Sequence, residues 1–177
     1  MSHILDLARP IRLLALDVDG VLTDGRLYYA ADGEQLKVFN TLDGHGLKML
    51  QASGVEVAII TGRNSPAMVR RVRDLGIQHL YAGREDKLTA LNELWEASDF
   101  SAADTAYMGD DWPDLPAMRA CALGATVPNA CNAVLQHADW CSEREGGQGA
   151  VRELCELIML AQNTLDTMLA PYLTGDR

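Results

Sequence analysis

The chain has little positive charge. Its 177 residues include 25 acidic side chains and only 15 lysines and arginines, which gives a formal net charge of -10. A surface with this balance repels a phosphate backbone instead of attracting it. The composition therefore argues against nucleic acid and anionic membranes as partners.

Long apolar runs and paired cysteines are also absent from the sequence. No stretch approaches the length of a transmembrane helix. The first twelve residues carry Asp6, Arg9 and Arg12, which interrupt the apolar core that a signal peptide needs. The four cysteines form no C-x-x-C pair, so reduced packing residues are favoured over a zinc site or disulfides. Together these absences predict a cytoplasmic protein.

What the sequence does contain is an alternation of short apolar runs and helical patterns. Hydrophobic residues make up 48% of the chain, which suits one domain over residues 1–177 with a sizeable core. Ser65 followed by Pro66 predicts the start of a helix, with Ser65 as the N-cap and Pro66 at the first helical position. The repeated alternation predicts an α/β fold with a doubly wound, mostly parallel sheet. Buried strands are expected at residues 11–16, 55–60, 79–82, 105–108, 122–127 and 139–142.

Two segments depart from the simple alternation. Residues 26–39 hold two β-prone runs separated by Asp32-Gly33, a strong hairpin signal, and this hairpin is expected to form a flap or an oligomer contact. Residues 150–169 are expected to form one long C-terminal helix. That helix is apolar on more than one side, which suggests subunit packing as well as a place in the core.

The main chemical signal follows the first predicted strand. The run Leu13-Leu14-Ala15-Leu16 ends in Asp17-Val18-Asp19-Gly20, so that two carboxylates stand one residue apart. An Asp-x-Asp-Gly segment taken alone is most simply a turn. Ligands of open α/β sheets, however, bind outside the carboxyl ends of the strands, where these two residues are expected to lie.

Further polar residues occupy corresponding places after the later strands. Thr61 ends the second buried run, Lys87 opens a helix, and Gly109 is followed by Asp110 and Asp111, with Asp114 close behind. Because right-handed crossovers bring strand ends to the same edge, these residues are expected to converge with the first pair. Clustered carboxylates require a hard cation, and oxygen ligands with room for water suit Mg²⁺.

This inventory is suited to phosphoryl transfer. One carboxylate can accept a phosphoryl group as an aspartyl phosphate, and a second can protonate the leaving alcohol and later deprotonate water. A hydroxyl and an ammonium nearby can hold the phosphoryl oxygens as their charge spreads.

The four motifs resemble those of the haloacid dehalogenase superfamily of phosphatases. The likeness extends to the hairpin, to Asp43-Gly44-x-Gly46 and to Gly146-Gly147-x-Gly149. Over residues 11–162 the chain is similar to the 3-deoxy-D-manno-octulosonate 8-phosphate phosphatase family. This resemblance implies a Mg²⁺-dependent phosphatase that releases the eight-carbon sugar acid and orthophosphate for lipopolysaccharide biosynthesis.

The resemblance also implies roles for the acidic residues. Asp17 would be the nucleophile and Asp19 the general acid and base. Asp17, the backbone carbonyl of Asp19, and Asp110 would hold Mg²⁺, with Asp111 and Asp114 supporting them from nearby.

Further implied roles concern the substrate and the assembly. Thr61 and Lys87 would bind the phosphoryl oxygens, and Gly62, Arg63 and Arg84 are candidates for the sugar acid, which carries its own carboxylate. Members of the family lack a large cap domain and form homotetramers, in which the hairpin and a neighbour's surface close each active site.

Three other functions are weighed against this one. A phosphatase acting on a nine-carbon, sialic-acid-type 9-phosphate would differ only where it reads the sugar tail. A phosphomutase shares the paired aspartates but normally has a cap, and none is expected to fit in this length. A receiver domain of signalling proteins combines a similar sheet with clustered aspartates, Thr and Lys, but in a different order along the chain.

Overall fold

The computed structural model describes residues 2–29, 31 and 35–173. The main sheet has the order β5-β4-β1-β6-β7-β8, and every neighbouring pair in it is parallel. The predicted α/β fold and all of its predicted strands are confirmed. The strands are β1 (Leu13–Leu16), β4 (Glu56–Thr61), β5 (His79–Ala82), β6 (Thr105–Met108), β7 (Leu123–Thr126) and β8 (Trp140–Cys141).

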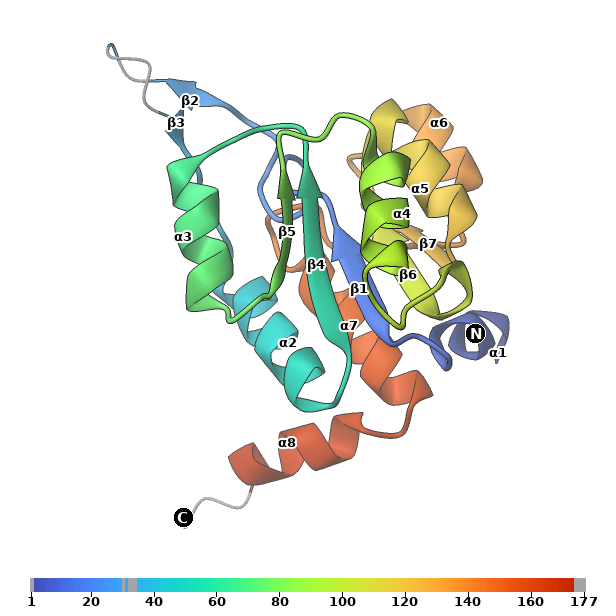
Figure 1. Cartoon of the computed structure of the whole chain (residues 1–177). Coiled ribbons are helices and arrows are strands. Elements are labelled where there is room, and N and C mark those ends of the chain that lie inside the picture. Colours follow the sequence, from blue (N-terminus) through green and yellow to red (C-terminus); the bar gives the residue numbers. More distant parts are fainter. Residues whose placement is uncertain (1, 30, 32–34, 174–177) are drawn as a thin grey trace.

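The helices pack on both faces of this sheet. In Figure 1, α4 and α5 lie in front of the sheet, and α2 and α7 lie behind it. The helices α1 and α5 were not expected from the sequence. The described helices are α1 (Ser2–Ala8), α2 (Thr41–Ala52), α3 (Pro66–Asp74), α4 (Lys87–Glu96), α5 (Leu115–Ala120), α6 (Asn132–His137), α7 (Ala150–Ala161) and α8 (Leu165–Leu173), with short 3₁₀ turns η1 (Ala102–Asp104) and η2 (Trp112–Asp114). None of the described helices has the length and apolarity to cross a membrane.

Strand β1 lies where the order of the strands reverses. The chain runs outward from β1 to β4 and β5 on one side, and later to β6, β7 and β8 on the other. All four residues of β1 are buried, because strands cover both of its edges and helices cover both of its faces. Leu16 is level with Ile59 of β4 and Met108 of β6. The next residue, Asp17, therefore emerges at the switch point, which is where open sheets bind ligands.

The predicted hairpin forms a small sheet of its own. Strands β2 (Tyr28–Tyr29) and β3 (Gln35–Leu36) pair antiparallel, with Tyr28 opposite Leu36 and Tyr29 opposite Gln35. Figure 1 shows this flap standing out from the main body at the edge where the parallel strands end. The Asp32-Gly33 turn lies outside the described residues.

The C-terminal prediction was wrong in one respect. Residues 150–169 form two helices instead of one, since α7 ends at Ala161 and α8 begins at Leu165. Asn163 between them has a φ of 59°, a left-handed conformation that an α-helix cannot contain. The side chain of Gln162 also donates to the carbonyl of Ile11 at 2.6 Å, which fixes the end of α7 against the start of β1.

Helix capping departs from the prediction at Ser65, and α7 has a cap that was not predicted. Pro66 is the first residue of α3 as expected, but the preceding Ser65 makes no capping hydrogen bond through its side chain. The N-terminus of α7 follows Gly149, which has no side chain to offer, and it is capped from another helix. Asp43 of α2 accepts the backbone N–H of Arg152 at 2.9 Å, so one buried carboxylate ties α2 to α7.

Candidate active site

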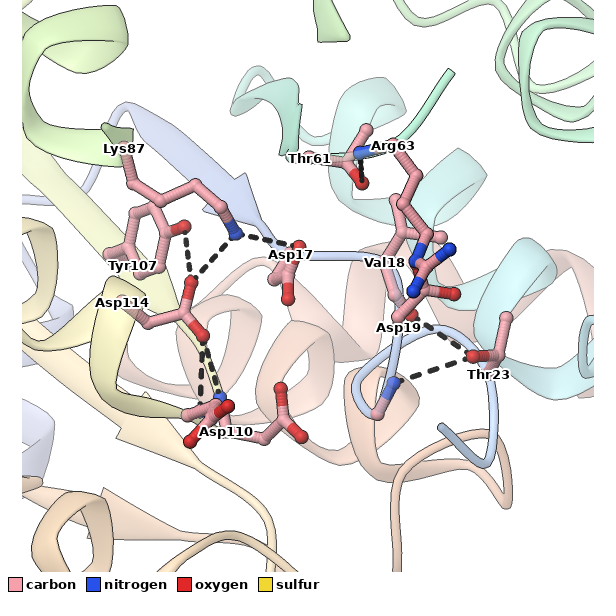
Figure 2. A network of polar contacts seen from close by, with 12 residues as sticks. Asp17, Val18, Asp19, Thr23, Thr61, Arg63, Lys87, Tyr107, Asp110 and Asp114 are labelled. Atoms are coloured by element: carbon pink, nitrogen blue, oxygen red, sulfur yellow. Dashed lines mark hydrogen bonds and ion pairs between the residues drawn. The ribbon is translucent and has the colours of Figure 1, made fainter. Parts of the chain in front are cut away.

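The predicted catalytic and metal-binding residues meet at one cavity. It has a volume of about 990 Å³ and opens at the carboxyl ends of β1, β4 and β6. Every residue predicted for catalysis, metal binding or substrate binding lines it, with the exception of Arg84. Figure 2 shows the polar network, with Asp17 at its centre.

On one side of Asp17 stands a buried ion pair. Lys87 is the first residue of α4, and its ammonium Nζ lies 2.8 Å from Oδ1 of Asp17 and 2.9 Å from Oδ1 of Asp114. The Lys87 side chain is only 5% exposed. Burial alone would lower the pKa of Lys87, but the carboxylates of Asp17 and Asp114 raise it above its ordinary value. Lys87 is therefore a fixed positive charge beside the Asp17 carboxylate.

Asp114 holds this side of the site together. Its Oδ1 also accepts the hydroxyl of Tyr107 at 2.9 Å, and its Oδ2 accepts the backbone N–H groups of Asp110 and Asp111 at 3.1 and 3.2 Å. With four donors on its two oxygens, Asp114 is a supporting residue of the site and not a free ligand. Its bonds to the backbone fix the loop that carries Asp110.

Asp110 has the free acceptor that a cation needs. Its Oδ1 is buried and has no hydrogen-bond partner within the described part of the chain. Oxygens of Asp17, Asp110 and Asp114 lie within 4.8 Å of one another. A buried carboxylate oxygen without a donor is costly unless something positive faces it. The donor set is all oxygen, which fits the predicted Mg²⁺ site.

The electrostatics of the carboxylates agree with this fit. Burial raises the pKa of Asp17 to about 6, and the neighbouring Asp114 adds to the rise while Lys87 opposes it. Burial also raises the pKa of Asp110 to about 7, with further repulsion from Asp17 and Asp114. One lysine thus leaves the cluster short of positive charge, and a divalent cation would supply it.

A close approach of backbone to side chain explains the glycine of the first motif. Gly20 has a positive φ of 97°, and a Cβ at this position would lie 2.0 Å from Oδ2 of Asp110. The loop that carries Gly20 is pinned at the carbonyl of Val18, which accepts the N–H groups of Leu22 and Thr23 at 3.0 Å. The segment Asp17-x-Asp19-Gly20 is therefore a tight turn, as the segment taken alone suggested. The turn also packs closely against the carboxylate of Asp110.

The glycine loop before α7 supports this turn from below. A Cβ on Gly146 would lie 1.7 Å from the carbonyl oxygen of Gly20, and Gly147 donates its N–H to the carbonyl of Val21 at 2.9 Å. The loop thus contacts the backbone of the first motif, and this tight packing accounts for the absence of a side chain at Gly146 and Gly147.

On the other side of Asp17, the site is built from the flap. Lys37, which directly follows β3, forms an ion pair with Asp19. Arg63 lies with its Nε 3.6 Å from Oδ2 of the same carboxylate. The Arg63 guanidinium also donates to the hydroxyl of Tyr29 on β2 at 3.4 Å. Asp19 is therefore linked directly to Lys37 of the flap and, through Arg63, to Tyr29 of β2.

Thr61 and Arg84 are placed differently from each other. Thr61, the last residue of β4, is buried at the cavity, and its hydroxyl accepts the N–H of Arg63 at 3.4 Å. Arg84 donates its backbone N–H to the carbonyl of Thr61, but its guanidinium pairs with Glu93 of α4 at 2.8 Å. The structure does not bring the Arg84 side chain into the cavity, which its neighbour Glu85 lines instead.

Tyr107 and Lys37 of this network were not singled out from the sequence. Tyr107 looks like an ordinary strand residue, and nothing local indicates its bond to Asp114. Lys37 did carry a signal. It stands between Leu36 and Val38, so that alternation along an extended chain places it on the face opposite to two exposed apolar residues.

Comparison with known proteins identifies the family. Residues 77–154 match the model for haloacid dehalogenase-like hydrolases. The chain is 45% identical over 165 residues to the 3-deoxy-D-manno-octulosonate 8-phosphate phosphatase of Salmonella typhi, covering 93% of this chain and 88% of the relative. This chain belongs to that family of hydrolases. The resemblance predicted from the motifs is confirmed, and because the relatives are phosphatases the receiver-like alternative is not retained.

Solved structures of the family superpose closely on this fold. A probable phosphatase of the YrbI family from Pseudomonas syringae has a TM-score of 0.98 and 48% identity, covering 99% of this chain and all of its own. The family member from Moraxella catarrhalis, described as a complex with magnesium ion, phosphate ion and the sugar acid KDO, has a TM-score of 0.95 and 45% identity, covering 97% of this chain and 99% of its own.

Proposed function

We propose that this chain is a Mg²⁺-dependent phosphatase that hydrolyses 3-deoxy-D-manno-octulosonate 8-phosphate through an aspartyl phosphate on Asp17. The observation that carries the proposal is the position of Asp17. It stands at the switch point of the sheet with the Lys87 ammonium 2.8 Å away. The relatives named for this reaction align over nearly the whole chain, and a neighbour of known structure is named with magnesium, phosphate and the product sugar acid.

In the first step, a carboxylate oxygen of Asp17 attacks phosphorus and the bond from phosphorus to the sugar oxygen breaks. Asp19 donates a proton to that oxygen, so the sugar leaves as a neutral alcohol. Thr61 and Lys87 line the cavity beside Asp17, where a hydroxyl and an ammonium stabilise the oxygens of the transferring group.

In the second step, the Asp19 carboxylate takes a proton from water as the water oxygen attacks phosphorus. The bond to Asp17 breaks and orthophosphate leaves. Asp17, the backbone carbonyl of Asp19, and Asp110 would hold Mg²⁺, which when bound neutralises the carboxylates and polarises the phosphoryl oxygens. The charge-assisted bonds of Lys87 keep Asp17 oriented through both steps.

The assembly and the setting of the enzyme are part of the same proposal. A homotetramer of single-domain subunits in the cytoplasm would place the flap of each subunit near a neighbour. Exposed apolar side chains on the flap support a contact of this kind, including Tyr29, Leu36 and Val38.

The proposal is tested by orthophosphate release from a panel of phosphorylated sugar acids, with Mg²⁺ and with EDTA. The eight-carbon 8-phosphate is expected to be turned over with higher kcat/KM than a nine-carbon 9-phosphate, and only with the metal. The variant Asp17→Asn is expected to lose at least about 10⁴-fold in kcat, because the nucleophile is gone. Turnover that survives this substitution would refute the mechanism, and preference for the nine-carbon compound would refute the substrate.

A further inference from the structure

A buried lysine on the flap faces the catalytic loop. Lys37 has exposed neighbours, since Leu36 is 64% and Val38 56% exposed, but its own side chain is only 4% exposed. The flap is otherwise an outlying element with strands of two residues each. Lys37 is thus the side chain through which β3 reaches back into the body of the protein.

The ammonium of Lys37 has one described acidic partner, the carboxylate of Asp19. A buried lysine without a carboxylate would carry an uncompensated charge, which strongly destabilises the fold. The Lys37 ammonium therefore needs the Asp19 carboxylate beside it. Each of the two aspartates in the first motif therefore has its own buried lysine. Lys87 forms an ion pair with Asp17, and Lys37 forms one with Asp19.

Tyr29, on the other flap strand β2, is linked to Asp19 through Arg63. Arg63 approaches the other oxygen of Asp19, and its guanidinium donates to the Tyr29 hydroxyl. A lone carboxylate on a surface loop would choose among several rotamers. Here Oδ1 accepts the Lys37 ammonium, whereas Oδ2 lies 3.6 Å from Nε of Arg63, which is too far for a hydrogen bond. Lys37 therefore fixes the carboxyl group through Oδ1 and leaves Oδ2 able to carry the proton.

We infer that Lys37 is a positioning residue that holds the Asp19 carboxyl group in the orientation needed to protonate the leaving oxygen. The inference rests on the proposed function, in which the phosphorus–oxygen bond to the sugar breaks as the proton of Asp19 passes to that oxygen. It makes the flap part of the catalytic apparatus as well as a cover for the site.

The leaving group distinguishes this role from a merely structural one. A sugar alkoxide is a poor leaving group and must receive a proton as its bond to phosphorus breaks. The p-nitrophenolate ion leaves readily without one. Misplacing Asp19 should therefore slow hydrolysis of the sugar-acid phosphate much more than the first step with p-nitrophenyl phosphate, whereas general damage to the site would slow both.

The experiment compares Lys37→Met with Lys48→Met in the full-length protein. Lys48 is an exposed lysine of α2 that does not line the cavity, and it serves as the control. Single-turnover release of the alcohol or phenolate is measured with both substrates, together with kcat and KM. Lys37→Met is expected to lose about 100-fold with the sugar-acid phosphate, the usual effect of a misplaced catalytic group. Loss with p-nitrophenyl phosphate is expected to stay below about threefold.

Two further variants keep the test decisive. Lys37→Arg, which keeps the charge, is expected to recover part of the loss with the sugar-acid phosphate. Lys37→Gln keeps a donor without the charge and replaces Lys37→Met if thermal melting shows that variant to be unfolded. An equal loss with both substrates, or no loss with either, would overturn the inference. A wild-type protein that is inactive with both would instead refute the proposed function.

Discussion

The two aspartates of the first motif stand in opposite surroundings. Asp17 lies on the sheet side, where Lys87, Asp114 and Tyr107 form a buried network anchored in α4 and β6. Asp19 lies on the flap side, with Lys37 and a half-exposed Arg63. Figure 2 shows the first group to one side of Asp17 and Arg63 with Asp19 to the other.

The difference separates two tasks of the site. The sheet side consists of elements packed on both faces, so it can hold the charges of the phosphoryl group in a fixed place for any phosphate ester. The flap side depends on a two-stranded hairpin whose described residues Lys37 and Tyr29 contact Asp19 and Arg63 of the body. We expect the sheet side to determine steps that are the same for every phosphate ester. We expect the flap side to determine protonation of the leaving group, which differs between substrates.

The largest effect is expected for Lys87→Met. It leaves the carboxylates of Asp17 and Asp114 buried without their cation, so the free energy of unfolding should fall by about 3–5 kcal/mol. Loss of the ammonium should lower kcat by about 10³-fold with the sugar-acid phosphate and with p-nitrophenyl phosphate alike. Urea denaturation and steady-state kinetics measure both effects. Normal hydrolysis of p-nitrophenyl phosphate by this variant would contradict the division between the two sides.

The next effect concerns Asp114→Asn, which removes the charge but keeps the shape. One of the two oxygens that accept from Lys87, Tyr107 and the backbone becomes an NH₂ group facing donors, so a loss of about 2–4 kcal/mol in stability is expected. More Mg²⁺ should be required for half-maximal activity, because the loop of Asp110 loses its anchor. Asp166→Asn, at an exposed aspartate of α8 that does not line the cavity, is the control, and an equal effect there would mean that the bonds to Asp114 are unimportant.

A smaller effect links pH to the metal. An aspartate with an ordinary pKa titrates at 3.8, whereas burial raises the pKa of Asp17 to about 6 and that of Asp110 to about 7. Because these folded-state values are raised, the EDTA-treated protein binds more protons folded than unfolded and should lose stability as the pH rises from 3.8 through 7.

Thermal melting between pH 5 and pH 8, with and without Mg²⁺, measures this dependence. Addition of Mg²⁺ should restore the melting temperature mainly at the upper end of this range. Asp110→Asn should flatten the pH dependence of the metal-free protein. A metal-free melting temperature that rises over the same interval would show that the carboxylates are not held in repulsion.

The smallest effect is expected for Asp43→Ala, at a residue that does not line the cavity. This change removes the carboxylate that caps α7, so a loss of about 1 kcal/mol in stability is expected. The ratio of activities with the two substrates should stay unchanged, since neither Lys37 nor Lys87 is touched. A shift in that ratio would show that the α2–α7 contact also positions Asp19.

The sheet side could be predicted from the sequence because it obeys a rule of connectivity. Right-handed crossovers place the residues after successive parallel strands at one edge, so Asp17, Thr61, Lys87 and Asp110 had to meet. Arg84, in contrast, was a candidate only through the family resemblance. On an exposed turn, however, its long side chain reached Glu93 instead, and no spacing argument fixes such a choice.

The flap side and the C-terminus depend on tertiary structure and were harder to predict. A hairpin was predictable from its turn and its β-prone runs, but the sequence alone does not say over which part of the body it folds, so the pairing of Lys37 with Asp19 was not predicted. The prediction of one helix over residues 150–169 was wrong for another reason. Leu165 and Met168 keep the helical spacing across the break, and only Asn163, a residue that tolerates a left-handed conformation, marks the interruption.

The most direct test of the central claim is a burst experiment with Asp19→Asn and p-nitrophenyl phosphate. Without Asp19 the phenolate can still leave, but water is not activated, so the aspartyl phosphate on Asp17 should accumulate. The prediction is a burst of one equivalent of p-nitrophenolate per active site and a phosphorylated Asp17 in the acid-quenched protein. A linear time course without a burst, or phosphate found on a different residue, would contradict the proposed division of roles between Asp17 and Asp19.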